Sequence, residues 1–268
     1  MTSNRTPTQR LLRHLGLQPR APTLDFLNDL VREHQLRVPF ETLTKLIDYD
    51  SAGQRGDFMP PLDEYVERIV GRGGGGLCWT LARGFQALLT ELGFDASLMV
   101  MVPGHCCVRV ELPQGPQGPQ YADVGYAAPI FRAYPLYESF TLQTHREVFE
   151  YSVRDQGIFV TRNPGPTKQL DPVPRRLEDL SDLIAAANDW SVPHSFLHRL
   201  VYARHVDGVY TSFRDGVLTR YVSGVAETVE VAPDAVAAAL ARIFGVDPAL
   251  VEQALQVRRR FGASSAAP

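Results

Sequence analysis

Cys78 combines a residue type and a local sequence that together suggest nucleophilic chemistry. It follows the stretch RGGGGL, so four glycines at 73–76 closely precede it. A thiolate rather than a thiol is the nucleophile, and an unperturbed cysteine has a pKa of about 8.5. Apolar residues recur at helical spacing over 81–92, and Gly93 follows them. The pattern predicts a helix that begins at or near Cys78, where the partial positive charge of a helix N-terminus favours the thiolate.

The glycine stretch gives Cys78 a second property that suits catalysis. A backbone without side chains lets a substrate and free N–H groups come close. Such N–H groups could form an oxyanion hole for acyl transfer. The alternative is a buried structural cysteine that caps a tight turn. The physics of this stretch alone leaves both interpretations open.

The residues after this predicted helix change to a period of two. Segments 96–102, 105–112 and 121–126 therefore predict three strands, with turns at Pro103–Gly104 and in the proline- and glutamine-rich stretch 113–120. His105 opens the second of these strands, and Asp123 lies on the third. In an antiparallel pair the start of one strand lies beside the end of the next.

This strand arrangement lets His105 and Asp123 be neighbours if both side chains point to the same face. Asp123 could then fix the tautomer of the imidazole, and His105 could take the proton of Cys78. Those are the roles of nucleophile, base and orienting carboxylate in a catalytic triad. A single histidine at a strand start is more often structural, so the argument depends on all three residues together.

The other two cysteines are adjacent, at Cys106 and Cys107. An odd number of three cysteines, two of them adjacent, makes a poor disulfide framework. Zinc sites usually use paired cysteines two to four residues apart, and adjacent residues on a strand point to opposite faces. We expect no metal site, and we interpret Cys106 and Cys107 as small core residues.

Composition limits the class of protein. The chain has 268 residues and a formal net charge of −3, so it offers no overall basic character for nucleic acid. No apolar run approaches the roughly 20 residues that span a membrane. The first ten residues are polar and lack the apolar core of a signal peptide. We expect a cytoplasmic protein with no nucleic-acid or membrane partner, and its oligomeric state stays open.

The remaining pattern favours an α+β fold. Helical spacing comes first, period-two segments occupy the middle, and both kinds follow. We expect a proline-rich connector at 164–174. The expected helices and strands elsewhere are helices within 8–34 (in two pieces), 61–70, 177–188, 232–244 and 248–260, strands at 147–154 and 157–162, and a hairpin in 208–222 with its turn at Arg214–Asp215–Gly216.

Several motifs in one order give the chain a resemblance to the arylamine N-acetyltransferases. VPFETL at 38–43 resembles the [VI]-P-F-E-N-L signature of that family, and GGGGLC at 73–78 resembles its R-G-G-x-C nucleophile motif. GHCCVRVEL with YADVGY resembles the histidine strand and the D-V-G-F element. ANDWSVPHSF at 187–196 is similar to the N…P-x-S-x-F stretch. The combination is specific, whereas any single piece is not.

The resemblance implies a three-part fold: a helical bundle at 1–94, an antiparallel β-barrel at 95–190 and an α/β lid at 191–268, with a triad arrangement like that of cysteine proteinases. It also implies a ping-pong reaction with no bound cofactor. Cys78 would take an acetyl group from acetyl-CoA and pass it to an arylamine, hydrazine or arylhydroxylamine, with His105 and Asp123 as partners. The other implied site residues are Gly75, Gly76 and Trp79 in the nucleophile loop, and Phe40 and Tyr126 at the substrate.

The chain departs from the family pattern close to the nucleophile. Gly74 occupies the slot where the family has an arginine, and Arg72 lies two residues earlier. Thr80 and Ala82 replace the usual Glu and Asn after the cysteine. The interval from Cys78 to His105 is also shorter than usual, which implies a trimmed loop.

These departures leave other functions open. One is an amide synthase that uses a carrier-bound acyl donor. Another is a transglutaminase-like cysteine hydrolase, although VPFETL argues against it. The third is a non-catalytic binding protein, which the retained Cys78, His105 and Asp123 oppose.

Overall fold

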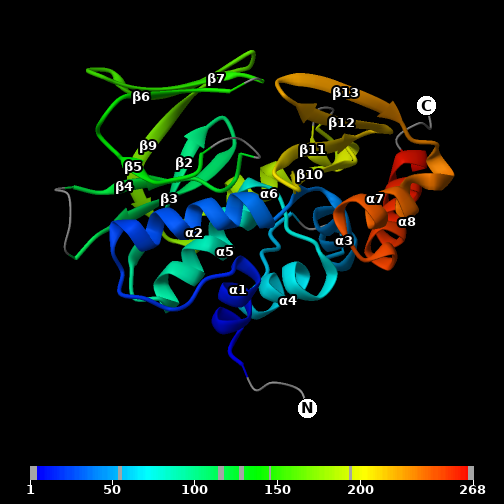
Figure 1. The fold of residues 1–268 in the computed structure, drawn as a ribbon, viewed down its shortest axis with the longest axis horizontal. Coiled ribbons are helices and arrows are strands. Elements are labelled where there is room, and N and C mark those ends of the chain that lie inside the picture. Colours follow the sequence, from blue (N-terminus) through cyan, green and yellow to red (C-terminus); the bar gives the residue numbers. More distant parts are fainter. Residues whose placement is uncertain are drawn as a thin grey trace. The chain divides into compact units, whose positions relative to one another are not determined.

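The computed structural model describes residues 5–53, 56–113, 118–126, 130–144, 146–192 and 195–264 (Figure 1). Contacts group the chain into two compact units. Unit 1 contains Met1–Arg37 and Cys78–Leu180, and unit 2 contains Val38–Leu77 and Ser181–Pro268. Each unit is thus built from two separate stretches of chain. The three-part division at 1–94, 95–190 and 191–268 stays a prediction.

The described part of unit 1 contains the α-helices α1 (Pro7–Leu15), α2 (Leu24–Arg37) and α5 (Cys78–Glu91). A short 3₁₀ helix, η1 (Leu177–Leu180), ends the unit. Thr6 and Gln9 form a reciprocal capping box at the start of α1, and Gly16 ends the helix with a left-handed φ of 73°. The two helices predicted within 8–34 and the helix predicted from Cys78 are confirmed.

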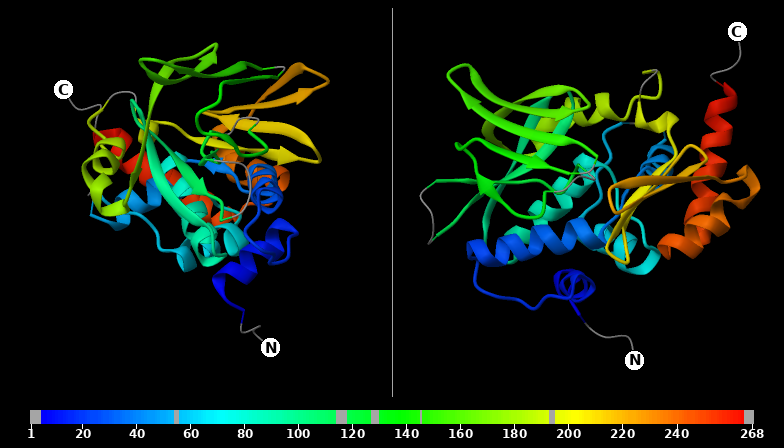
Figure 2. Two further views of the ribbon diagram at one scale, coloured as in Figure 1. Left: turned by 90° about the vertical axis from the view of Figure 1, so that its left-hand side faces the viewer. Right: turned by 45° about the horizontal axis from the view of Figure 1, so that its top comes forward.

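The sheet of unit 1 is antiparallel and curls into a half-barrel (Figures 1 and 2). Its strands lie in the order β5-β4-β3-β2-β9-β8-β7-β6. Their bounds are β2 (Asp95–Val102), β3 (His105–Glu111), β4 (Gln120–Ala122), β5 (Tyr134–Pro135), β6 (Phe140–Gln143), β7 (Val148–Arg154), β8 (Gly157–Asn163) and β9 (Thr167–Arg175). The α+β class is confirmed, the expected antiparallel β-barrel is a half-barrel, and the α/β lid stays a prediction.

The expected proline-rich connector at 164–174 is wrong, because most of it forms β9. The register between β8 and β9 ends at Leu170, so Pro172 and Pro174 fall where β9 pairs only with β2. A proline lacks the N–H that a second partner strand would need, and such one-sided pairing tolerates it. The third predicted strand is also shorter than expected, since β4 ends at Ala122.

The core of the half-barrel is rich in aromatic rings. Tyr121, Phe149 and Tyr151 are fully buried there, together with Met99 and Cys107. Cys106 is fully buried as well, so both adjacent cysteines are core residues, as predicted. Helix α5 packs on β2 and β3, which places the first turn of this helix close to the turn between those strands.

Unit 2 pairs an antiparallel sheet with helices. The sheet order is β1-β10-β11-β12-β13, with β1 (Phe40–Glu41), β10 (Val201–Val206), β11 (Val209–Arg214), β12 (Val217–Val222) and β13 (Val225–Glu230). The helices are α3 (Leu43–Ser51), α4 (Leu62–Arg72), α6 (Ser181–Ala187), α7 (Val236–Phe244) and α8 (Pro248–Ser264), with 3₁₀ turns η2 (Phe196–His198) and η3 (Pro233–Ala235). The predicted hairpin is β11–β12: Arg214 pairs with Val217, and Asp215 and Gly216 take positive φ.

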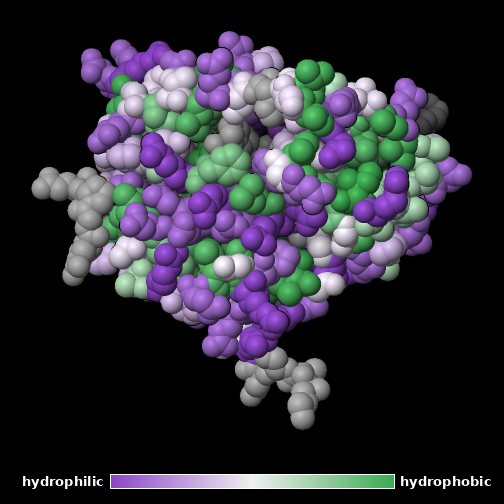
Figure 3. All heavy atoms as spheres, viewed as in Figure 1, coloured by the Kyte–Doolittle hydropathy of each residue, from purple (hydrophilic) through white to green (hydrophobic). Residues whose placement is uncertain are grey.

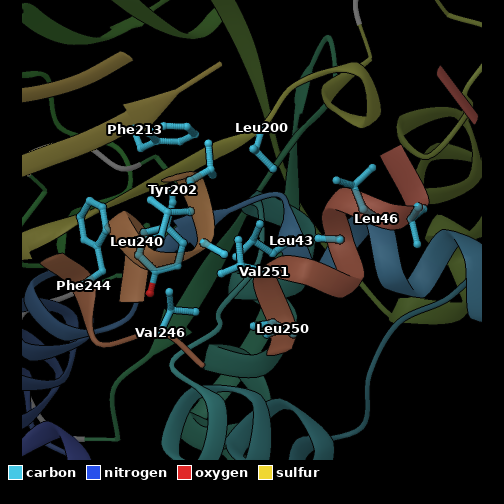
Figure 4. Packing of buried hydrophobic residues seen from close by; sticks show 14 of the residues in the cluster. Leu43, Leu46, Leu200, Tyr202, Phe213, Leu240, Phe244, Val246, Leu250 and Val251 are labelled. Atoms are coloured by element: carbon cyan, nitrogen blue, oxygen red, sulfur yellow. The ribbon is translucent and has the colours of Figure 1, made fainter. Parts of the chain in front are cut away.

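Unit 2 has its own apolar core (Figure 4). Leu43 and Leu46 of α3 meet Tyr202 of β10, Leu240 of α7 and Val251 of α8, and all five side chains are fully buried. The face of the molecule in Figure 3 mixes hydrophilic and hydrophobic residues. Within the part of the chain that the structure describes, every helix is too short or too polar to cross a bilayer.

Candidate active site

Cys78 is the first residue of α5 and is half-buried. None of the side chains in the first turn, all of which the structure describes, is acidic. The Cys78 sulfur lies 4.0 Å from the carbonyl oxygen of Gly104, in the turn between β2 and β3. The thiol therefore sits at the positive end of a helix, as the sequence predicted.

His105 and Asp123 are brought together by the register of β3 and β4. Val108 pairs with Ala122, so the same register continued by one pair sets Asp123 opposite Cys107, two residues from His105. Residues two apart on a strand share a face. The His105 Nε2 lies 2.8 Å from Asp123 Oδ2, and both side chains are buried. The structure therefore confirms that the His105 and Asp123 side chains are in contact.

Asp123 accepts three hydrogen bonds on its carboxylate. Besides the His105 Nε2–H, the Tyr121 hydroxyl donates to Oδ2 at 2.6 Å and the Gly125 N–H donates to Oδ1 at 2.8 Å. The amide of Gln35 on α2 donates to the Asp123 carbonyl at 3.0 Å. Burial works to raise the pKa of Asp123, but His105, Tyr121 and Gly125 hold it below its usual range. The carboxylate is therefore charged and fixed, and it orients Nε2–H toward itself.

This orientation leaves the other ring nitrogen of His105, Nδ1, for the Cys78 thiol, with which His105 forms a hydrogen bond. Burial would raise the pKa of Cys78, but the charge of His105 and hydrogen bonds from His105 and the Cys106 N–H lower it. Burial would lower the pKa of His105, yet the charges of Asp123 and Cys78 raise it to about 9. The two shifts favour a thiolate–imidazolium pair.

Gly125 lies directly against the first residue of α5. A Cβ on Gly125 would come within 2.8 Å of the Cys78 Cα and 2.9 Å of its Cβ. Contacts below about 3 Å between such atoms force the backbone to move. Glycine at this position is therefore required by close packing rather than by an unusual φ.

Tyr126 covers the imidazole. Its ring is stacked on His105 with centroids 3.8 Å apart and planes 14° apart, and only 6% of the residue is exposed. The Arg162 guanidinium lies 4.8 Å from the Tyr126 centroid and is paired with Glu147 through two hydrogen bonds of 2.7 and 2.8 Å. A ring held in this way limits the rotation of His105.

The glycine stretch before Cys78 belongs to unit 2, where Glu41 holds it. The Gly75 N–H donates to Glu41 Oε1 at 2.9 Å, and the Glu41 N–H donates to the Gly76 carbonyl at 3.0 Å. A Cβ on Gly75 would lie 2.1 Å from the Pro39 carbonyl oxygen. Phe40 forms a parallel bridge with Gly76. Two hydrogen bonds and a β-bridge thus hold the VPFETL strand and the glycine stretch side by side.

Glu41 holds the glycine stretch without an ion pair to any described residue. It is fully buried, and the Thr44 hydroxyl and N–H also donate to it at 2.6 and 3.0 Å. Burial raises its pKa, although these hydrogen bonds oppose the rise. A Cβ on Gly74, where the resemblance implies an arginine, would meet Thr44 Cγ2 at 3.0 Å, and the Arg72 guanidinium lies 3.2 Å from Asp247 instead. The displaced arginine therefore does not take over the glycine stretch.

The predicted site residues divide between the two units. Cys78, His105, Asp123 and Tyr126 lie together in unit 1, and Trp79 follows Cys78 in α5 with 7% exposure. The predicted residues of unit 2 are Phe40, Gly75 and Gly76.

Sequence reasoning did not single out Tyr121, Gly125, Lys168 or the bracing role of Glu41. Tyr121 and Gly125 lie in the YADVGY element that also contains Asp123, so their positions beside Asp123 could have marked them as candidates. Lys168 is one of only two lysines in the chain, which distinguishes it but does not place it.

Solved structures with the same fold are arylamine N-acetyltransferases. The enzyme of Mycobacterium marinum has 22% identity and a TM-score of 0.76, with 93% of this chain and 99% of that chain covered. Its structure in complex with CoA matches with 21% identity, a TM-score of 0.76 and coverage of 94% and 98%. The Mycobacterium smegmatis enzyme has 21% identity, a TM-score of 0.77 and coverage of 95% and 99%. At these identities the likeness establishes the fold.

The family model for N-acetyltransferases matches residues 23–251. Because this range is most of the chain, the protein belongs to the N-acetyltransferase family, and the resemblance read from the sequence motifs is confirmed. The chain is an N-acetyltransferase enzyme. Among the curated proteins, none matches the chain.

Proposed function

We propose that the protein transfers an acetyl group from acetyl-CoA to the nitrogen of an arylamine, hydrazine or arylhydroxylamine through a thioester on Cys78. The observation that carries this proposal is the hydrogen-bonded series Cys78–His105–Asp123 at the start of α5. The CoA complex of the Mycobacterium marinum enzyme supports acetyl-CoA as the donor. The cytoplasm stays the expected compartment.

In the first half-reaction the Cys78 thiolate attacks the acetyl carbonyl carbon. The new bond joins the Cys78 sulfur to that carbon, and the bond from the carbon to the CoA sulfur breaks. The proton on His105 Nδ1 goes to the departing CoA thiolate, so CoA leaves as its thiol and a neutral imidazole remains.

In the second half-reaction the acceptor nitrogen attacks the thioester carbon. Neutral His105 removes the proton that the nitrogen must lose, and the Cys78 thiolate departs. This restores the thiolate–imidazolium pair. Asp123 keeps the imidazole in the tautomer that both steps need. In this proposal Gly75, Gly76 and Trp79 form the nucleophile loop, and Phe40 and Tyr126 contact the substrate.

The test is the intact mass of the protein after mixing with acetyl-CoA and no amine. We expect an adduct of one acetyl group (about 42 Da) on wild type and none on Cys78→Ala, since only Cys78 is an activated thiol. Addition of an arylamine such as aniline should discharge the adduct. Buried Cys106 and Cys107 provide the internal control, because both remain in Cys78→Ala.

Other outcomes of this experiment contradict the proposal in different ways. An adduct that water discharges as fast as aniline does would indicate a hydrolase. No adduct from acetyl-CoA, with rapid alkylation of Cys78, would indicate a carrier-bound acyl donor. No adduct and no alkylation would indicate a non-catalytic protein.

The rate of acetylation of Cys78 should have a bell-shaped pH profile. On the alkaline side the rate should fall with a midpoint near pH 9, because the pKa of His105 is raised to about 9 and the imidazolium proton is lost above it. On the acid side the rate should fall below the lowered pKa of Cys78, where the thiolate is protonated. Single-turnover rates measured from pH 4 to 10 would check this, and a flat profile between pH 8 and 10 would contradict it.

A further inference from the structure

Lys168 is a half-buried cation at the turn that contacts the nucleophile, and the mechanism above does not use it. It stands near the start of β9, where it pairs with Val160 of β8, and the next residue, Gln169, pairs with Val102 of β2. Its Nζ donates to the Pro103 carbonyl at 3.0 Å. Pro103 and Gly104 form the turn whose next carbonyl lies 4.0 Å from the Cys78 sulfur. Lys168 therefore fixes the turn that contacts the nucleophile.

Lys168 makes no ion pair with a carboxylate among the described residues. Its Nζ lies 6.0 Å from the Tyr126 centroid, and Arg162 lies over the same ring. Arg162 has Glu147 as its partner. Among the residues that the structure describes, by contrast, no carboxylate oxygen lies within ion-pair distance of Lys168. Two cations thus face the ring, and of these Arg162 has a carboxylate partner whereas Lys168 makes no ion pair with a described residue.

We propose that Lys168 is a positioning residue that holds the Pro103–Gly104 turn against Cys78 and stabilises the thiolate form of Cys78. This inference deepens the proposed function, on which it rests, because it concerns the same thiol. A cation near a thiolate lowers the free energy of the charged form relative to the neutral thiol. The half-buried position keeps solvent from screening this effect fully.

The direction of the pKa shifts agrees with this assignment. The charge of Lys168 is among the influences that lower the pKa of Cys78, after His105 and the Cys106 N–H. The pKa of Lys168 itself is lowered, chiefly by burial and also by Arg162, whereas Cys78 and Asp123 oppose that change. The titratable and charged groups that face these two residues are His105, Cys106 and Cys107 on β3, Asp123 and Tyr126 after β4, and Arg162 on β8.

The experiment is the rate of Cys78 alkylation by iodoacetamide as a function of pH, on the full chain without an acyl donor. Lys168→Met removes the charge and the hydrogen bond, Lys168→Gln removes the charge but keeps an N–H donor, and Lys168→Arg keeps the charge. We expect Lys168→Met and Lys168→Gln to raise the midpoint of the profile by about one pH unit, which is a tenfold loss of thiolate below the midpoint. The midpoint of Lys168→Arg should stay near that of wild type.

Arg175→Met is the matched control, because Arg175 lies on the same strand and is exposed and paired with Asp171. Its profile should equal that of wild type. Cys78→Ala gives the background from the other cysteines. Lys168→Gln and Lys168→Arg keep the test decisive if Lys168→Met does not fold.

Three outcomes would overturn the inference. Equal midpoints in wild type and Lys168→Gln would show that the charge has no effect. A rate that falls equally at every pH would limit Lys168 to holding the turn. A wild-type midpoint equal to the pKa of an unperturbed cysteine would contradict the proposed function as well. The first two outcomes leave the proposed function intact.

Discussion

Asp123→Asn should lower kcat/KM for acetyl transfer by about 10³- to 10⁴-fold. The carboxylate accepts from His105, Tyr121 and Gly125, so three donors converge on two oxygens. An Asn side chain replaces one of these acceptors with an NH₂ donor, which would face donors. The imidazole would then favour the tautomer with its proton on Nδ1, which cannot accept the proton of the Cys78 thiol.

Single-turnover acetylation with acetyl-CoA measures this effect without a requirement for a known acceptor. Asp171→Asn is the matched control: Asp171 lies on β9, is partly exposed, and accepts hydrogen bonds from Arg175 and from the Val173 N–H. The control should retain wild-type rates. Retention of more than a tenth of the wild-type rate in Asp123→Asn would contradict the orienting role of Asp123.

Gly125→Ala should damage the site through packing alone. The added Cβ would meet the Cys78 Cα at 2.8 Å and the Cys78 Cβ at 2.9 Å. Neither atom belongs to a flexible side-chain end, so the start of α5 or the segment after β4 must move. Overpacking of this kind costs about 1–3 kcal/mol in the free energy of unfolding. Displacement of the nucleophile by about 1 Å can cost about 10²-fold in rate.

Both quantities should be measured for Gly125→Ala, by urea denaturation and by single-turnover acetylation. Gly262→Ala is a suitable control, because no atom within 4 Å would meet its Cβ and the residue lies in helix α8. It should be neutral or slightly stabilising. A Gly125→Ala protein with wild-type rates would show that the close contact with Cys78 can relax without loss of function.

The sequence predicted the parts of the site that depend on local patterns. Helical spacing after Cys78 predicted where α5 begins, and period-two segments predicted β2 and β3. His105 and Asp123 could be placed together because antiparallel neighbours and a short connection restrict the register. These arguments need little beyond the sequence around each residue.

The contacts that support the site depend on geometry that no local pattern contains. Glu41 and Gly75 are 34 residues apart, and Lys168 and Pro103 are 65 residues apart. Tyr121 and Gly125 are each only two residues from Asp123, so their contacts are local, but period-two spacing does not show that both reach its carboxylate. The prolines of β9 misled the prediction for a further reason, since one-sided pairing of a strand is a property of the whole sheet.

Because each unit is built from two separate stretches of chain, the two units can complete their folding only at different times during synthesis at the ribosome. Every residue of the Cys78–His105–Asp123 series and its supporting contacts lies before Leu180, so unit 1 has all its parts once that residue emerges. Strand β1 must wait much longer, because Phe40 pairs with Ala203. Leu43 has its final core only after Val251 has been added. A nascent chain therefore carries an apolar segment without its partners for most of its synthesis, and such segments are the ones that chaperones bind and that aggregate when production is fast.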